Sequence, residues 1–69
     1  MDNFTEREQE IMILILEGLS NKEISKALSV SEHTTKMHIA SIYKKLGVTN
    51  RVLAVVRCFK EKPSFISKD

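Results

Sequence analysis

Residues 20–46, SNKEISKALSVSEHTTKMHIASIYKKL, constrain the fold of this chain more than any other stretch. Ser20 followed by Glu23 has the spacing of a capping box and therefore opens a short helix. Residues 29–31 interrupt the helical pattern, and Ser31 is placed to cap a longer helix. The stretch predicts two consecutive helices joined by a tight turn.

Two further helices can be placed from their ends. Thr5, with a glutamate three residues later, forms another capping box, and Gly18 supplies a left-handed stop. Thr49 or Asn50 can cap a last helix, which Pro63 ends. With only two glycines, one proline and no alternating β-branched run closed by hairpin turns, the chain is expected to be all-α. The expected helices run over about 5–17, 21–28, 32–46 and 50–61, within one domain at 1–62 that a flexible tail, 63–69, follows.

Helical spacing of apolar residues predicts the face of each helix that packs inward. In the first three helices this face is expected to hold Ile11, Leu14, Ile15, Ile24, Ala27, Leu28, Thr35, Ile39, Ile42 and Leu46. The apolar content of 42% suits a folded chain, and 69 residues allow one small core.

The net charge of +2 hides an asymmetry along the chain. Residues 1–17 hold five acidic side chains and one arginine, whereas residues 18–69 hold ten basic and four acidic ones. Positive charge concentrated after the first helix indicates a surface for a polyanion, although an ordinary solvated basic surface would give the same count.

The face of the third helix opposite its core stripe carries no acid beyond Glu32. At 100° per residue this face holds His33, Lys36, Met37, Ala40, Ser41 and Lys44. A helix that enters the DNA major groove must avoid carboxylates, and small residues let its backbone approach base edges. Lys36 can donate to guanine, Met37 can pack on a thymine methyl, and Ser41 can donate or accept. Taken singly, an exposed Met is also typical of partner packing, and the helix dipole alone explains lysines near a helix end.

The sequence FTEREQEIMILILEGLSNKEISKALSVSEHTTKMHIASIYKKLGVTNRVLAV, residues 4–56, resembles the LuxR-type (LuxR/GerE/NarL) DNA-binding domain without a gap. The resemblance implies a four-helix helix-turn-helix domain without a wing. Its third helix would read the major groove, and its fourth would form a homodimer on inverted half-sites. It places base-reading positions at Lys36, Met37 and Ala40. The phosphate-contacting positions that it implies are Lys22, Ser31, Thr34, His38, Lys44 and Lys45.

Three residues depart from the family pattern. Thr35 stands where Val is usual, and its hydroxyl is expected to bond back to the carbonyl of Ser31. Ser25 replaces Ala where two helices cross. Ala40 replaces a residue that is often basic or polar, which removes one possible base contact. Arg51 matches a recurrent family residue, and either a phosphate contact or an internal ion pair is compatible with it.

The apolar residues of the last helix have two interpretations. Val52, Val55, Val56 and Phe59 either complete the monomer core or form a homodimer seam, because three short helices cannot cover all four without some exposure. We expect the dimer, mainly from the resemblance.

Other kinds of chemistry find little support in the sequence. His33 and His38 are five residues apart and have no second cysteine beside them, so we expect no metal and no cofactor. The lone Cys58 fits a core or interface position in a cytoplasmic protein. No apolar run could span a bilayer, and no Gly-rich phosphate loop or buried carboxylate pair suggests an enzyme.

Two functions therefore remain. The first is a bacterial transcription regulator that binds double-stranded DNA and recruits or blocks RNA polymerase. The second is a helix-turn-helix used as a protein-interaction module, with only non-specific DNA affinity.

Overall fold

The computed structural model describes residues 3–61 and residue 63. It contains helices α1 (Glu6–Leu16), α2 (Asn21–Leu28), α3 (Glu32–Leu46) and α4 (Arg51–Glu61), and no strand occurs among the described residues. The prediction of an all-α fold is confirmed, and each observed helix begins and ends within one residue of its expected position. The predicted tail lies outside the described residues except for Pro63, which is buried.

Both predicted capping boxes are present. The Thr5 hydroxyl accepts from the backbone N–H of Glu8 at 3.1 Å, and the Glu8 carboxylate accepts from the Thr5 N–H at 3.0 Å. Ser20 and Glu23 make the same pair of bonds at 3.1 and 2.7 Å. These reciprocal bonds satisfy N–H groups that have no partner inside the helix, and they fix where α1 and α2 begin.

Left-handed backbone conformations end the first three helices. Gly18 and Gly47 have φ of 90° and 72°, which glycine adopts at little cost. Ser29, directly after α2, has φ of 58°, and it is the one non-glycine residue with positive φ in the described part of the chain. The chain then passes through Ser31, whose hydroxyl accepts from the Thr34 N–H at 3.0 Å and starts α3.

The core lies between α3 and the other three helices, each of which α3 contacts. Its buried apolar residues are Phe4, Ile11, Met12, Ile15, Ile24, Ile39, Ile42, Leu46, Ala54 and Cys58. The predicted stripe of α3 is confirmed at all four positions, and the Thr35 hydroxyl donates to the Ser31 carbonyl at 3.1 Å as expected.

Of the residues predicted for the core faces, Ala27 is the one that the structure exposes. In α1 the fully buried Met12 was not predicted, whereas Leu14 is half-buried and packs against the core. In α2 Ala27 is exposed and Ser25 is buried in its place, with its hydroxyl donating to the Lys22 carbonyl at 2.7 Å. In α4 the inward face belongs to Ala54 and Cys58, and of the four apolar residues named from the sequence only Val55 packs against the core.

Candidate nucleic-acid interface

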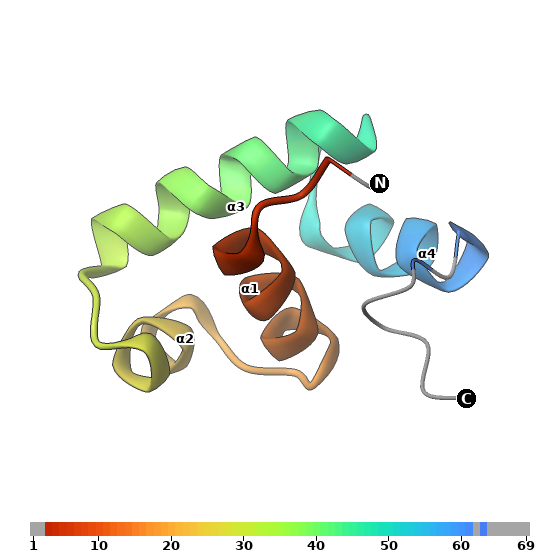
Figure 1. The fold of residues 1–69 in the computed structure, drawn as a ribbon. Coiled ribbons are helices and arrows are strands. Elements are labelled where there is room, and N and C mark those ends of the chain that lie inside the picture. The colour runs from red at the N-terminus through yellow and green to blue at the C-terminus, as the bar shows by residue number, and fades with distance from the viewer. Residues whose placement is uncertain (1–2, 62, 64–69) are drawn as a thin grey trace.

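One long face of α3 is uncovered. Figure 1 shows α3 running across one side of the molecule, with α1, α2 and α4 all packed against its other side. The helix is 15 residues long, and its first turn follows the α2–α3 turn directly. This arrangement, a short helix supporting a second helix that presents its outer face, is that of a helix-turn-helix unit.

The uncovered face of α3 is basic and free of carboxylates beyond Glu32. Its exposed residues after Glu32 are His33, Lys36, Met37, Ala40 and Lys44. The side chain of Met37 is 61% exposed although it is large and apolar. The lysine ammonium groups of such a face can bind DNA phosphates and base edges, and its apolar centre can pack on a base. No carboxylate on the face repels the phosphates.

The hydroxyl groups at the start of α3 lie beside this face. The Ser31 hydroxyl donates to the Thr34 hydroxyl at 3.0 Å, which leaves the Thr34 hydrogen able to bond a phosphate oxygen. Ser31 is exposed and Thr34 is half-buried at the positive end of the helix dipole. Lys22 is exposed in the first turn of α2, and His38 is half-buried one turn after Thr34.

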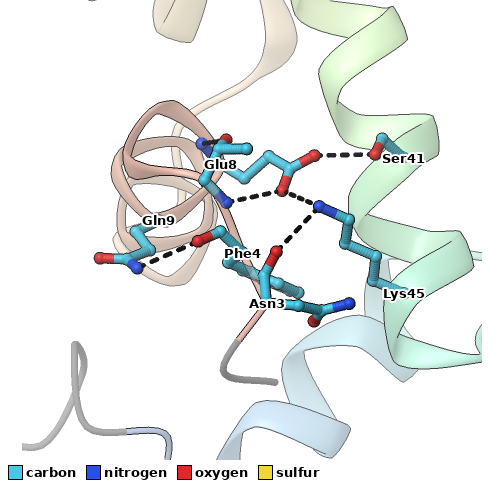
Figure 2. Close-up of polar contacts among 7 residues, drawn as sticks. Asn3, Phe4, Glu8, Gln9, Ser41 and Lys45 are labelled. Carbon is cyan, nitrogen blue, oxygen red and sulfur yellow. Dashed lines mark hydrogen bonds and ion pairs between the residues drawn. The ribbon is translucent and has the colours of Figure 1, made fainter.

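Ser41 and Lys45 do not belong to the uncovered face. Figure 2 shows both side chains pointing to α1, with the Glu8 carboxylate between them. The Ser41 hydroxyl donates to Glu8 Oε2 at 2.7 Å, and Lys45 Nζ donates to Glu8 Oε1 at 2.6 Å. Lys45 also donates to the Asn3 carbonyl at 3.1 Å and lies 5.9 Å from the centroid of the Phe4 ring. We call Glu8, Ser41 and Lys45 the Glu8 bridge.

The Glu8 bridge gives Ser41 and Lys45 internal partners that the sequence interpretation did not foresee. Ser41 is half-buried and its hydroxyl hydrogen is bonded to Glu8, so only its oxygen is left, as an acceptor, for a base contact. Lys45 was expected to contact a phosphate, but its charge is already paired and only 24% of its side chain is exposed. From the sequence, Glu8 was assigned mainly to helix capping. Its spacing from Ile11, Met12 and Ile15, which places it on the core face of α1, was the signal of a buried carboxylate that needs a cation.

Opposing effects act on the Glu8 carboxyl. Burial raises its pKa, but hydrogen bonds from Lys45, the Thr5 backbone and Ser41, together with the Lys45 charge, lower it by more, and the resulting pKa is about 2. The carboxylate is therefore ionised throughout the physiological range, and the ion pair with Lys45 persists there.

Arg51 makes hydrogen bonds to neutral oxygens in place of the ion pair considered from the sequence. Its guanidinium donates to Asn21 Oδ1 at 3.5 Å and to the Leu19 carbonyl. These bonds fasten the start of α4 to the α1–α2 connection and to the first residue of α2. The Asn50 side chain accepts from the Leu53 N–H at 2.9 Å and caps the same helix.

The outer side of α4 carries an apolar strip. Val52, Leu53, Val56 and Phe59 are 71%, 45%, 42% and 69% exposed, whereas Val55 packs against the core. Leu53 was not singled out from the sequence. So much apolar surface on one short helix is typical of an interface with another molecule.

The residues considered for other chemistry are separated. Cys58 is 2% exposed, and burial raises the pKa of its thiol. His33 is exposed and His38 half-buried, and among the described residues no three His, Cys, Asp or Glu side chains are placed to hold a metal ion. None of the helices described has the length and apolar character needed to cross a membrane.

Comparison with protein families matches residues 2–58 to the bacterial regulatory proteins of the luxR family. The chain is 43% identical over 61 residues to a nitrate/nitrite response regulator protein homolog of Haemophilus influenzae, and the match covers 88% of this chain and 29% of that protein. It is 45% identical over 56 residues to the response regulator protein VraR of Staphylococcus aureus, and this match covers 81% of this chain and 27% of that protein. The chain thus spans less than a third of the length of these relatives.

Two solved structures share the fold. The response regulator ChrA of a heme-sensing two-component system superposes with a TM-score of 0.82 at 39% identity, over 86% of this chain and 29% of that one. The transcription factor GerE superposes with a TM-score of 0.75 at 38% identity, over 84% of this chain and 87% of that one.

Proposed function

The chain belongs to the LuxR family of bacterial regulatory proteins, and from this we propose that it binds double-stranded DNA sequence-specifically and regulates transcription. The observation that carries the proposal is the uncovered face of α3, which is basic and has no carboxylate after Glu32. We place the DNA-binding domain at residues 1–62 and the protein in the bacterial cytoplasm, without enzymatic activity.

In the proposed complex α3 lies in the major groove. Lys36 donates to guanine O6 or N7, Met37 packs on a thymine methyl, and Ala40 lets the backbone approach the bases. Lys44 contacts a phosphate beyond them. Lys22, Ser31, Thr34 and His38 bind the phosphates that flank the groove at the other end, Ser31 by turning its hydroxyl hydrogen from Thr34 to a phosphate oxygen. These contacts fix the register of α3 without reading sequence. Ser41 and Lys45 are not included among the DNA contacts, because both side chains donate to the Glu8 carboxylate.

We further propose that two copies pair through the apolar strip of α4. The exposed Val52, Val56 and Phe59, with Leu53 beside them, supply the contact, while Val55 supports it from the core. A two-fold dimer would present two α3 helices to inverted half-sites, so the target should be an inverted repeat. A bound dimer would then recruit RNA polymerase or block its access.

Replacing Lys36 tests the base contact. Lys36→Ala should weaken binding by about 1–3 kcal/mol and relax the preference at one base pair of each half-site. Lys60→Ala, which removes the same charge from an exposed position near the end of α4, serves as the matched control. Titration of both variants against duplexes carrying each base at that position measures the effect.

The exposure of Met37 supports a second candidate, a protein-interaction module. In that case DNA binding by the unaltered chain should be weak and non-specific, and Lys36→Ala should leave the base preference unchanged.

A further inference from the structure

The buried position of Glu8 has no explanation in helix capping alone. The capping box at Ser20 works with an exposed Glu23, whereas Glu8 is 4% exposed. Removing a carboxylate from water is costly unless charged and hydrogen-bonding partners replace the water. Every partner beyond the Thr5 N–H comes from α3, at two positions one helical turn apart. The carboxylate therefore joins α1 to the second half of α3 (Figure 2).

Lys44 and Lys45 are consecutive in sequence but differ in their surroundings. Lys44 is exposed, whereas Lys45 is half-buried, paired with Glu8 at 2.6 Å and bonded to the Asn3 carbonyl. A phosphate would have to compete with a close, largely desolvated carboxylate for the Lys45 ammonium, and such pairs are the stronger ones. Four half-buried residues of α3 form one row along the edge of its uncovered face: Thr34, His38, Ser41 and Lys45. Ser41 and Lys45, the two that bond Glu8, lie at the C-terminal end of this row.

We infer that Glu8 is a positioning residue for DNA recognition, which withholds Ser41 and Lys45 from DNA and leaves Lys44 as the phosphate contact of the last turns of α3. The inference rests on the proposed function and deepens it. With Lys45 neutralised, α3 carries less charge toward phosphates, and non-specific affinity, which depends on phosphate contacts, is kept low relative to specific affinity.

The salt dependence of binding reports this directly, because each phosphate contact adds about 0.9 to the slope of log K against log salt. The slope is measured for the 69-residue chain on a non-specific duplex between about 50 and 200 mM salt. We expect Lys44→Met to lower the slope by about 1, and Lys45→Met to leave it unchanged. Glu8→Gln should free Lys45 and raise the slope by about 1.

The double variant Glu8→Gln/Lys45→Met keeps the test decisive if Lys45→Met alone fails to fold. It leaves no unpaired buried charge, and its slope should return to that of the unaltered chain. If Glu8 had only a structural role, Glu8→Gln would lower the affinity for the duplex without steepening the salt slope. The inference is overturned if Glu8→Gln does not steepen the slope. It is also overturned if the slope of the double variant is lower than that of the unaltered chain, as the slope of Lys44→Met is expected to be.

The base preference of binding tests the inference about Glu8 independently of the salt slope. Ser41→Ala should leave the enriched sequence unchanged, since Glu8 already holds the hydroxyl, whereas Lys36→Ala should alter it. A changed preference in Ser41→Ala would contradict the inference while the proposed function stands. An unaltered chain that shows no salt-sensitive DNA binding would overturn the proposed function and the inference with it.

Discussion

Glu8 combines two tasks in one side chain, a cap for α1 and an anion for α3. Its pKa of about 2 lies below the ordinary value of 4.5, so the folded state prefers the ionised form. The resulting stabilisation is complete above pH 4.5, where the unfolded chain is also ionised, and is lost as pH falls through 4.5 toward 2.

We predict that the free energy of unfolding declines over this pH interval and that Glu8→Gln removes most of the decline. Urea denaturation at a series of pH values measures it. Glu10→Gln is the matched control, because its side chain is 57% exposed on the same helix. Equal pH dependence in Glu8→Gln and the unaltered chain would contradict the assignment.

The residues of the Glu8 bridge also mark where prediction from the sequence ended. Helical periodicity identified the exposed Lys36, Met37, Ala40 and Lys44, because that face depends only on α3 itself. Ser41 and Lys45 lie at its border, and their side depends on a partner 33 and 37 residues away in sequence. No local rule places that partner.

At the scale of helices and turns, the α2–α3 turn contains a costly conformation. Ser29 has φ of 58°, and the left-handed region costs a non-glycine residue about 1–2 kcal/mol. Ser29→Gly should therefore stabilise the fold by up to about 1 kcal/mol after the entropy that glycine loses on folding. Ser29→Val should destabilise it, since a β-branched side chain fits this region poorly. Thermal denaturation should rank the variants Gly, Ser, Val; a loss of stability in Ser29→Gly would count against this view of the turn.

Helix ends were predictable because their signals are local. Thr5, Ser20, Ser31 and Asn50 each bond a backbone N–H three residues ahead, a relation visible in the sequence. The inward face of α4 was not predictable in the same way. The valines and Phe59 are larger and more apolar than Ala54 and Cys58, but the smaller residues are the buried ones. Which side of α4 packs inward depends on contacts with residues distant in sequence, such as the bonds of Arg51 to Asn21 and Leu19.

For the whole molecule, the proposed dimer makes a separable prediction. Phe59→Glu should abolish cooperative binding to paired half-sites while binding to one half-site and the melting temperature change little, because Phe59 is 69% exposed in the monomer. Sedimentation of the complexes and titration on single and paired half-sites measure this. Lys60→Gln changes the net charge equally at the next residue and should keep cooperativity. Unaltered cooperativity in Phe59→Glu would exclude α4 as the seam.

The fold as a whole followed from the sequence, and so did the helix proposed to meet DNA. What the sequence did not supply is the assembly of these parts, which depends on contacts such as Glu8 with Ser41 that join distant segments. The proposed charge pattern on α3 is a property of this assembly, since it is Glu8 of α1 that removes Lys45 from it.

The central claim is that this chain reads a DNA sequence as a dimer. Selection of bound duplexes from a randomised pool, at about 150 mM salt to suppress purely electrostatic binding, tests it most directly. Binding as a dimer should enrich an inverted repeat with two matching half-sites. Retention without enrichment that vanishes as salt rises would contradict it.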